Sequence, residues 1–327
     1  MEVDTSTEKL KCLQGLAGGI IASMDSAFVP GLRLAGEFYA EVVRPLLDAA
    51  FPGLRYTAGL LGPGSEVLGF DTERSTDHDW GPRLLLFLTP NDSERHARAI
   101  TIMLTERLPG AFRGYPVAFC LTGDGVARHR VQVTELGGWL TGQLGFDPRS
   151  GVTVPDWLAV PSQQLAEVTA GAVFHDGPGE LSRARTRLEW YPGDVWRYVL
   201  GCQWVRIAQE EAFPGRCAEV GDELGSAVVT ARLARDLMRL WLLMNRRYPP
   251  YSKWLGTAFS RVPGTAPLAA SLTAALTETI TDPAIRRLPP IGAADQFMDS
   301  TDALGELRYP RAVVAAGLER SANERVM

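Results

Sequence analysis

The chain has 327 residues, 46% of them hydrophobic and 22% charged, which is the composition of a folded protein with enough length for two domains. Its formal net charge of −5 disfavours a protein that coats nucleic acid, because such proteins need a broad basic surface. No uncharged apolar run reaches the ~18 residues of a membrane span, and the acidic start at residues 1–4 is unlike a signal peptide, so we expect a cytoplasmic protein without membrane partners.

Two amphipathic helices are predicted in the first half of the chain. Residues 32–51 place their apolar side chains near one face, and Pro52 stops the pattern. Pro45 lies inside this segment and predicts a kink. The second helix is expected to be capped by Asp92 and to run to about Leu108.

Short apolar runs bounded by turn residues predict strands in the same half. These runs are residues 55–61, 84–88, 117–121 and 130–134, and the last two are expected to form a β-hairpin through the Gly-Asp-Gly turn at 123–125. Because helices and strands alternate, the first half is predicted to be a mixed α and β domain.

The second half shows long helical periods separated by proline and glycine. Apolar residues recur at spacings of three and four in two long segments, one that begins after Pro192 and one that ends at Met244. This pattern predicts a helical bundle. We therefore expect two domains, residues 1–150 with an α+β fold and residues 151–327 with a helical fold.

The segment that carries most chemical information joins the first two predicted strands. Gly64 and Ser65 form a turn in which backbone N–H groups can approach a phosphate closely and the serine hydroxyl adds a donor. If Asp77 and Asp79 lie on the first residues of the next strand, their carboxylates share one face, because strand side chains alternate. Two such carboxylates repel each other, and a hard cation such as Mg²⁺ or Mn²⁺ relieves the repulsion. The alternative is a solvated turn or cap without a metal.

This arrangement resembles the nucleotidyltransferase superfamily that includes DNA polymerase β and kanamycin nucleotidyltransferase. The family pattern is a glycine followed by glycine or serine, then a short gap and two aspartates that flank a hydrophobic residue. Gly64, Ser65, Asp77 and Asp79 match this pattern, whereas His78 stands where the family has an aliphatic residue.

Longer stretches resemble a bacterial branch of this superfamily that is known only as a domain of unknown function. The similar stretches are residues 64–70, 75–82, 171–176, 215–223 and 251–255. The resemblance implies a nucleotidyltransferase-type mixed sheet with flanking helices, followed by a C-terminal helical bundle that covers the substrate.

The resemblance also implies a third carboxylate on a neighbouring strand, which completes the metal site or takes a proton from the attacking group. In the expected strand, Gln132 has an inward position but carries no charge. Glu135 at the strand end is our candidate, and Asp124 is expected to form the hairpin turn. If neither acid reaches the site, the protein would bind a nucleotide without transferring it.

Lys253 is the residue of the helical half that we expect to contact the triphosphate. Related enzymes use a lysine or arginine of the second domain for this contact, and aromatic neighbours could hold Lys253 in place. The alternative is a surface lysine whose side chain lies over Trp254.

Three functions remain open at this point. The first is transfer of a nucleotidyl group, AMP when the co-substrate is ATP, from a nucleoside triphosphate to a small-molecule acceptor, with release of pyrophosphate. In this reading Asp77 and Asp79 bind Mg²⁺, and Gly64 and Ser65 hold the β and γ phosphates. The second is a nucleotide-binding or scaffold protein without catalysis. The third is modification of a protein or tRNA, which the negative charge disfavours.

Overall fold

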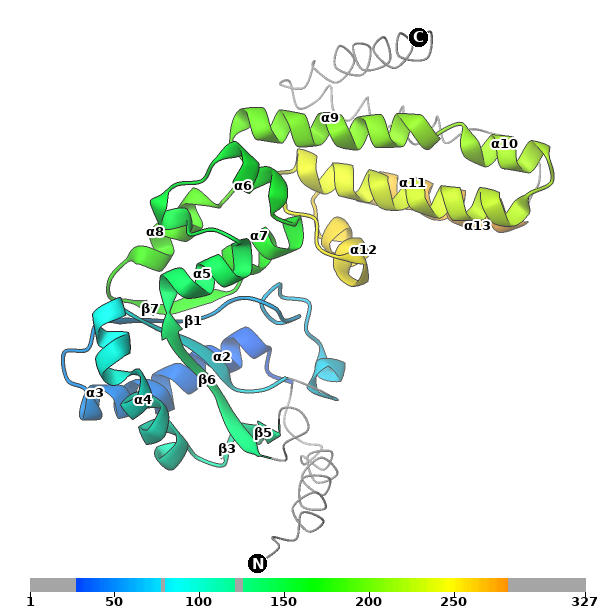
Figure 1. Cartoon of the computed structure of the whole chain (residues 1–327). Coiled ribbons are helices and arrows are strands. Elements are labelled where there is room, and N and C mark those ends of the chain that lie inside the picture. Colours follow the sequence, from blue (N-terminus) through cyan, green and yellow to red (C-terminus); the bar gives the residue numbers. More distant parts are fainter. Residues whose placement is uncertain (1–27, 78–79, 121–125, 282–327) are drawn as a thin grey trace, which may run out of the picture. The chain divides into compact units, whose positions relative to one another are not determined.

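The computed structural model describes residues 28–77, 80–120 and 126–281 (Figure 1). The chain forms two compact units, which divide between Glu189 and Trp190. The first unit has a mixed α and β fold, and the second is helical. Within the described ranges, no helix is both long and apolar enough to cross a bilayer.

A five-stranded sheet is the centre of the first unit. Its order is β5-β6-β2-β1-β7, with β2 and β6 parallel and all other neighbours antiparallel. The strands are β1 (Tyr56–Leu60), β2 (Arg83–Leu88), β5 (Ala118–Cys120), β6 (Ala127–Glu135) and β7 (Ala172–Asp176), beside a separate hairpin of β3 (Ala111–Phe112) and β4 (Tyr115–Pro116). The four strands expected from the apolar runs are therefore present, and the turn at 123–125 lies outside the described residues.

Helices pack around this sheet, and several of them follow β6 in the chain (Figure 1). They are α2 (Gly31–Phe38), α3 (Arg44–Ala50), α4 (Pro90–Arg107), α5 (Leu136–Leu144), α6 (Val154–Ala159), α7 (Ser162–Thr169) and α8 (Glu180–Arg187), with short 3₁₀ turns η2 (Glu73–Asp77) and η3 (Pro148–Ser150).

The helix expected over 32–51 is present, but it is interrupted by a π-helical segment. This segment, Tyr39–Val43, joins α2 directly to α3. Pro45 lies in the first turn of α3 and has no N–H to donate to the carbonyl of Glu41, so the wider turn just before it is the local response to the proline. The helix ends at the C-cap residue Phe51.

The cap of α4 differs from the expected one. Thr89 is the N-cap, and its hydroxyl oxygen accepts a hydrogen bond from the N–H of Asp92 at 3.2 Å. Asp92 lies three residues later, and its carboxylate accepts from the Thr89 hydroxyl at 2.7 Å. Pro90 fits the first helical position because its fixed φ suits the helix and the position needs no N–H donor. Asp92 therefore supports the cap that Thr89 provides.

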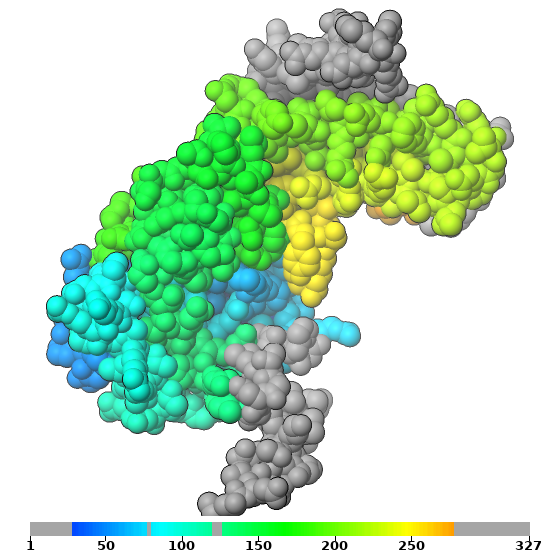
Figure 2. Space-filling model, viewed as in Figure 1, coloured from blue at the N-terminus to red at the C-terminus, as the bar shows by residue number. Residues whose placement is uncertain are grey.

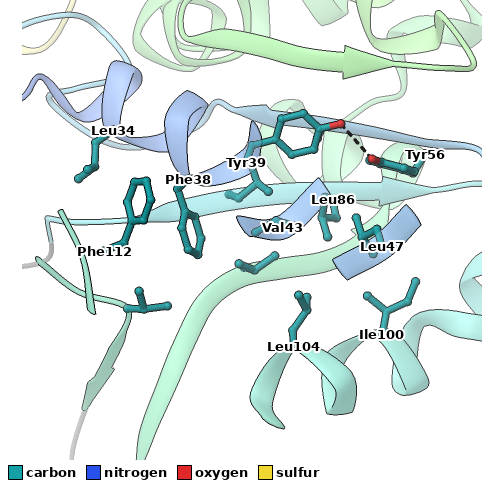
Figure 3. Packing of buried hydrophobic residues seen from close by; sticks show 14 of the residues in the cluster. Leu34, Phe38, Tyr39, Val43, Leu47, Tyr56, Leu86, Ile100, Leu104 and Phe112 are labelled. Carbon is teal, nitrogen blue, oxygen red and sulfur yellow. Dashed lines mark hydrogen bonds between the residues drawn. The ribbon is translucent and has the colours of Figure 1, made fainter. Parts of the chain in front are cut away.

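The main core lies between one face of the sheet and the helices α2, α3 and α4 (Figure 3). Leu84, Leu86 and Leu88 alternate along β2 and point to this face, and each is at most 4% exposed. Burial of a leucine contributes about 1.5–3 kcal/mol, so this face holds the helices on the sheet. Two tyrosines add a buried polar contact, since the hydroxyls of Tyr39 and Tyr56 are 2.9 Å apart.

The division between the units comes later in the chain than the expected boundary at residue 150. β7 pairs with β1 as the last strand of the sheet, and the hydroxyl of Thr57 donates to Asp176 at 2.7 Å. The segment after residue 150 therefore completes the first unit before the helical unit begins at Trp190.

The helical unit is organised around its longest helix, α11. Its helices are α9 (Gly193–Glu210), α10 (Phe213–Glu219), α11 (Glu223–Met244), α12 (Ser252–Ser260) and α13 (Ala266–Thr281). The other four all contact α11. The expected apolar stripe is confirmed, because Leu233, Leu237, Leu240 and Met244 are buried. The indole N–H of Trp196 on α9 also donates to the carbonyl of Leu243 at 2.8 Å.

Candidate functional site

The Gly-Ser turn lies in the loop that joins β1 to β2. These strands are antiparallel neighbours. The last residue of β1, Leu60, and the first residue of β2, Arg83, therefore lie at the same end of the two strands. Gly64, Ser65 and Asp77 all lie in the connection between them. The local fold therefore brings the expected phosphate turn and the first expected aspartate into one loop.

An ion pair anchors this loop to the sheet. Arg83 Nε lies 2.6 Å from Glu66 Oε1 without hydrogen-bond alignment, and Arg83 Nη2 donates to the carbonyl of Pro63 at 2.5 Å. The side chains of Glu66 and Arg83 are 5% and 17% exposed. Because loss of one partner from a buried pair costs about 3–5 kcal/mol, this contact holds the turn in place.

The conformation of Gly64 depends on the same arginine. Its φ is +153°, and a Cβ atom there would lie 2.1 Å from Arg83 Nη2 and 2.7 Å from Glu66 Oε2. A side chain at residue 64 would therefore displace the end of the Arg83 side chain, whatever the loop binds. Ser65 follows half-buried, and its carbonyl accepts from the N–H of Phe70 at 2.8 Å, which closes the turn.

Asp71 fixes the other side of the loop. Its carboxylate accepts from the N–H of Gly31, the first residue of α2, at 2.6 Å and from the indole N–H of Trp80 at 3.3 Å. A negative charge at a helix N-terminus is favoured by the helix dipole. A Cβ on Gly31 would lie 2.7 Å from Cβ of Glu66, so α2 begins in direct contact with the loop. No short sequence pattern points to a role for Glu66, Asp71 or Arg83 at this loop.

Asp77 ends the 3₁₀ turn η2, six residues before β2 begins. The expected placement on the first residues of the strand is therefore not found for Asp77, because the strand starts only after Gly81 and Pro82. The side chain of Asp77 and the whole of Asp79 lie outside the described residues. In the part of the chain that is described, no group of three histidine, cysteine or acidic residues could hold a metal ion.

The neighbouring strand β6 places an arginine beside the first residue of β2. Arg83 pairs in register with Arg130 and Leu85 with Gln132, so these four side chains share one face of the sheet. The opposite face carries Val131, which belongs to the main core. Gln132 therefore lies on the face opposite the main core, and it is exposed rather than turned inward.

Glu135 lies at the other end of β6. It pairs in register with Leu88, five residue steps and about 16 Å along the strand from Arg83. Its carboxylate accepts from the N–H groups of Gly137 at 2.8 Å and Gly138 at 2.9 Å, so it is the N-cap of α5. The structure therefore gives Glu135 a capping position away from the β1–β2 loop. Asp124 lies outside the described residues.

Glu135 also belongs to an ion-pair network around Arg149. The guanidinium lies 2.8 Å from Asp147, 2.5 Å from Glu180 and 3.4 Å from Glu135. The hydrogen bonds from Arg149 hold the pKa of Asp147 below its ordinary value, although partial burial acts in the opposite direction. This network borders a cavity of about 380 Å³ and joins α8 to the 3₁₀ turn η3. Its contacts account for Glu135 without a role at the loop.

A larger cavity of about 740 Å³ lies along β6 and reaches Arg83. Arg128, Arg130 and Gln132 line it from β6, and Thr101 lines it from α4. Its volume is in the range of small-molecule sites. The anchored loop and this cavity share Arg83 and form the candidate site.

Lys253 belongs to the helical unit, on α12. Its Nζ atom lies 4.8 Å from the ring centroid of Trp254, and the residue is exposed. The space-filling view shows the yellow segment that contains α12 at the surface of this unit (Figure 2). The alternative expected from the sequence, a surface lysine over Trp254, agrees with this contact. The expected contact of Lys253 with a triphosphate stays a prediction.

Comparison with known proteins gives two similarities. The model of a family described as "Domain of unknown function (DUF4037)" matches residues 157–255, which run from α6 across the division between the units into α12. The crystal structure of a nucleotidyltransferase-like protein from Exiguobacterium sibiricum 255-15 covers 89% of this chain and 91% of its own, at 11% identity and a TM-score of 0.32. No curated protein matches significantly. The chain is thus similar, over less than half of its length, to a family whose function is unknown.

Proposed function

We propose that the protein is a nucleotidyltransferase that binds a nucleoside triphosphate, ATP in the simplest case, in the loop between β1 and β2. The observation that carries this proposal is the loop itself. Gly64 and Ser65 lie in a turn anchored to the first residue of β2, and Asp77 follows in the same connection. A glycine turn whose N–H groups can approach a phosphate, followed by aspartates in the same connection, suits a phosphate chain together with a cation.

The donor set in this loop fits Mg²⁺ or Mn²⁺. The two aspartates, Asp77 and Asp79, and the hydroxyl of Ser65 are oxygen ligands, which hard divalent cations prefer. Such an ion, when bound, neutralises phosphate charge in an in-line displacement at the α phosphorus. The chain would contribute the aspartates that hold the ion and the Gly64–Ser65 turn that binds the β and γ phosphates.

Calorimetric titration with ATP and Mg²⁺ tests the proposal. We expect Asp77→Asn and Asp79→Asn each to weaken binding about ten- to a hundred-fold, the range for loss of a charged contact. Asp48→Asn is the matched control, because Asp48 is an exposed aspartate of α3 that pairs with Arg44 at 3.5 Å on the same helix. Equal ATP affinity in the double variant and the parent would remove the loop as the nucleotide site.

A second candidate function is nucleotide binding without transfer. It is supported by the described face of β6, which offers Gln132 where a third carboxylate was expected, while Glu135 caps α5. Incubation of the protein with α-labelled ATP and the small-molecule fraction of a cell extract separates the two functions. A labelled small product that requires Asp77 supports transfer, and ATP binding without any product supports the second candidate.

The same incubation with a complete lysate tests the acceptor class. Label on protein or tRNA would replace the small-molecule acceptor with a macromolecule. The titration of Lys253→Ala with ATP and Mg²⁺ tests whether Lys253 contributes to nucleotide affinity.

A further inference from the structure

Arginines gather where α9 and α11 lie side by side in the helical unit (Figure 1). They are Arg206 on α9 and Arg232, Arg235 and Arg239 on α11. The three on α11 are spaced three and four residues apart, so they lie on one side of that helix. Two carboxylates pair with them, Asp236, whose side chain is 3% exposed, and Glu210.

Both carboxylates of this cluster already have arginine partners. One oxygen of Asp236 accepts from Arg206 Nε at 2.8 Å, and the other accepts from Arg235 Nε at 3.1 Å and Nη2 at 3.0 Å. Glu210 pairs with Arg232 at 2.5 Å. Three of the four arginines therefore engage the two carboxylates.

Arg239 is the fourth arginine, and it is half-buried. Among the residues that the structure describes, no carboxylate lies within ion-pair distance of it. Burial lowers the pKa of its guanidinium. Asp236 acts in the opposite direction, and the charges of Arg235 and Arg206 add to the decrease. The guanidinium has thus lost part of its hydration without a direct counter-charge, and an incoming anion would stabilise it.

Arg206 also offers donors to a ligand. Its Nε–H binds Asp236, its side chain is 49% exposed, and no contact with the described residues uses its two Nη groups. A guanidinium presents five N–H donors in a planar fork that matches the oxygens of a phosphate group. Arg206 and Arg239 together therefore provide donors and positive charge for one anion.

We propose that Arg206 and Arg239 bind the phosphate group of a small molecule, while Arg235 adds positive charge from its place beside Asp236. A phosphate group carries up to two negative charges near neutral pH and presents three or more acceptor oxygens, which suits two guanidinium forks. The proposal does not rest on nucleotidyl transfer, and binding by these arginines requires no metal ion.

Calorimetric titration of the full-length protein in EDTA tests the class of ligand. The probes are inorganic phosphate, phenyl phosphate and benzoate. We expect at least one of the two phosphates to bind, and benzoate to bind about ten-fold more weakly because it offers fewer charge-assisted hydrogen bonds. Comparison of the two phosphates distinguishes free phosphate from a phosphate monoester. Equal affinity for benzoate, or no binding of either phosphate, overturns the proposal.

Charge-neutral variants locate the site. We expect Arg206→Gln and Arg239→Gln each to weaken binding of the preferred phosphate about ten- to a hundred-fold. Arg197→Gln is the matched control, because Arg197 is an exposed arginine of α9 that pairs with Asp194 at 2.9 Å. Unchanged affinity in either Arg206→Gln or Arg239→Gln, or an equal loss in Arg197→Gln, overturns the assignment.

Thermal melting separates binding from a structural role of Arg239. Because a ligand stabilises the folded state that binds it, phosphate should raise the melting temperature of the parent and of Arg197→Gln, and not that of Arg239→Gln. Without phosphate, Arg239→Gln should melt no lower than the parent, since it removes a half-buried charge that has no direct counter-charge. A large loss of stability in Arg239→Gln without phosphate would show that Arg239 is a structural contact, which overturns its place in the site.

Discussion

Gly64 offers the sharpest test of how the β1–β2 loop is built. In Gly64→Ala, the added Cβ would lie 2.1 Å from Arg83 Nη2, so the end of this side chain has to move away from the carbonyl of Pro63. Loss of a hydrogen bond from a charged group costs about 1.5–3 kcal/mol. The positive φ of +153° adds about 1–3 kcal/mol of backbone strain. Gly64→Ala should therefore destabilise the protein by about 3–6 kcal/mol.

Gly151→Ala supplies the matched control for the strain. Gly151 has a φ of +120°, and an added Cβ would meet no atom within 4 Å. Urea unfolding should show Gly64→Ala to be about 1.5–3 kcal/mol more destabilising than Gly151→Ala, and this excess should shrink when each change is made in an Arg83→Ala background. Equal effects of the two alanines in the parent, or an excess that stays the same without Arg83, would refute the steric account.

Three further predictions follow from described contacts. Glu135→Ala should lower the free energy of unfolding by about 1 kcal/mol through loss of the α5 cap and leave ATP affinity unchanged; reduced ATP affinity measured by calorimetry would contradict the capping role. Burial alone would raise the pKa of Asp176, but hydrogen bonds from Ser182 and Thr57 hold it below its ordinary value. Asp176→Asn should therefore be less stable than the parent above about pH 4, and this difference in stability should close as the pH falls further. A difference that stays constant in urea titrations from pH 7 to pH 3 would contradict this. Tyr39→Phe should lower the free energy of unfolding by about 1–3 kcal/mol, because it leaves the buried hydroxyl of Tyr56 without its partner. A second change, Tyr56→Phe, should recover part of that loss in a double-mutant cycle. Additive losses would show that the two hydroxyls are not coupled.

Local patterns in the sequence predict much of this fold. The apolar runs that became β1 and β2 end in turn residues, so each strand was visible without its partner. The cap of α4 shows the limit of such reading, because Thr89 and Asp92 are both suitable capping residues. Only the geometry around Pro90 shows that the threonine accepts the N–H bond.

The candidate site depended on contacts between distant residues, which no short pattern reveals. Glu66 and Arg83 are single charged residues in the sequence, and their pairing requires the loop to fold back onto β2. Glu135 was a reasonable candidate while the register between β2 and β6 was unknown, since a parallel pair is joined by a long crossover. The register places it opposite Leu88, at the far end of the strand.

The position of β7 late in the chain has a practical consequence for work on the α+β unit alone. A fragment that stops at residue 150 would lack the strand that covers β1, and the backbone N–H and C=O groups of residues 57–60 would form an open sheet edge. Such an edge is a template for pairing with other chains, so we expect that fragment to aggregate. It would also lose the bond from the N–H of Gly62 to the carbonyl of Glu167, which ties the start of the β1–β2 loop to α7. An expression fragment that ends at Glu189 keeps both features.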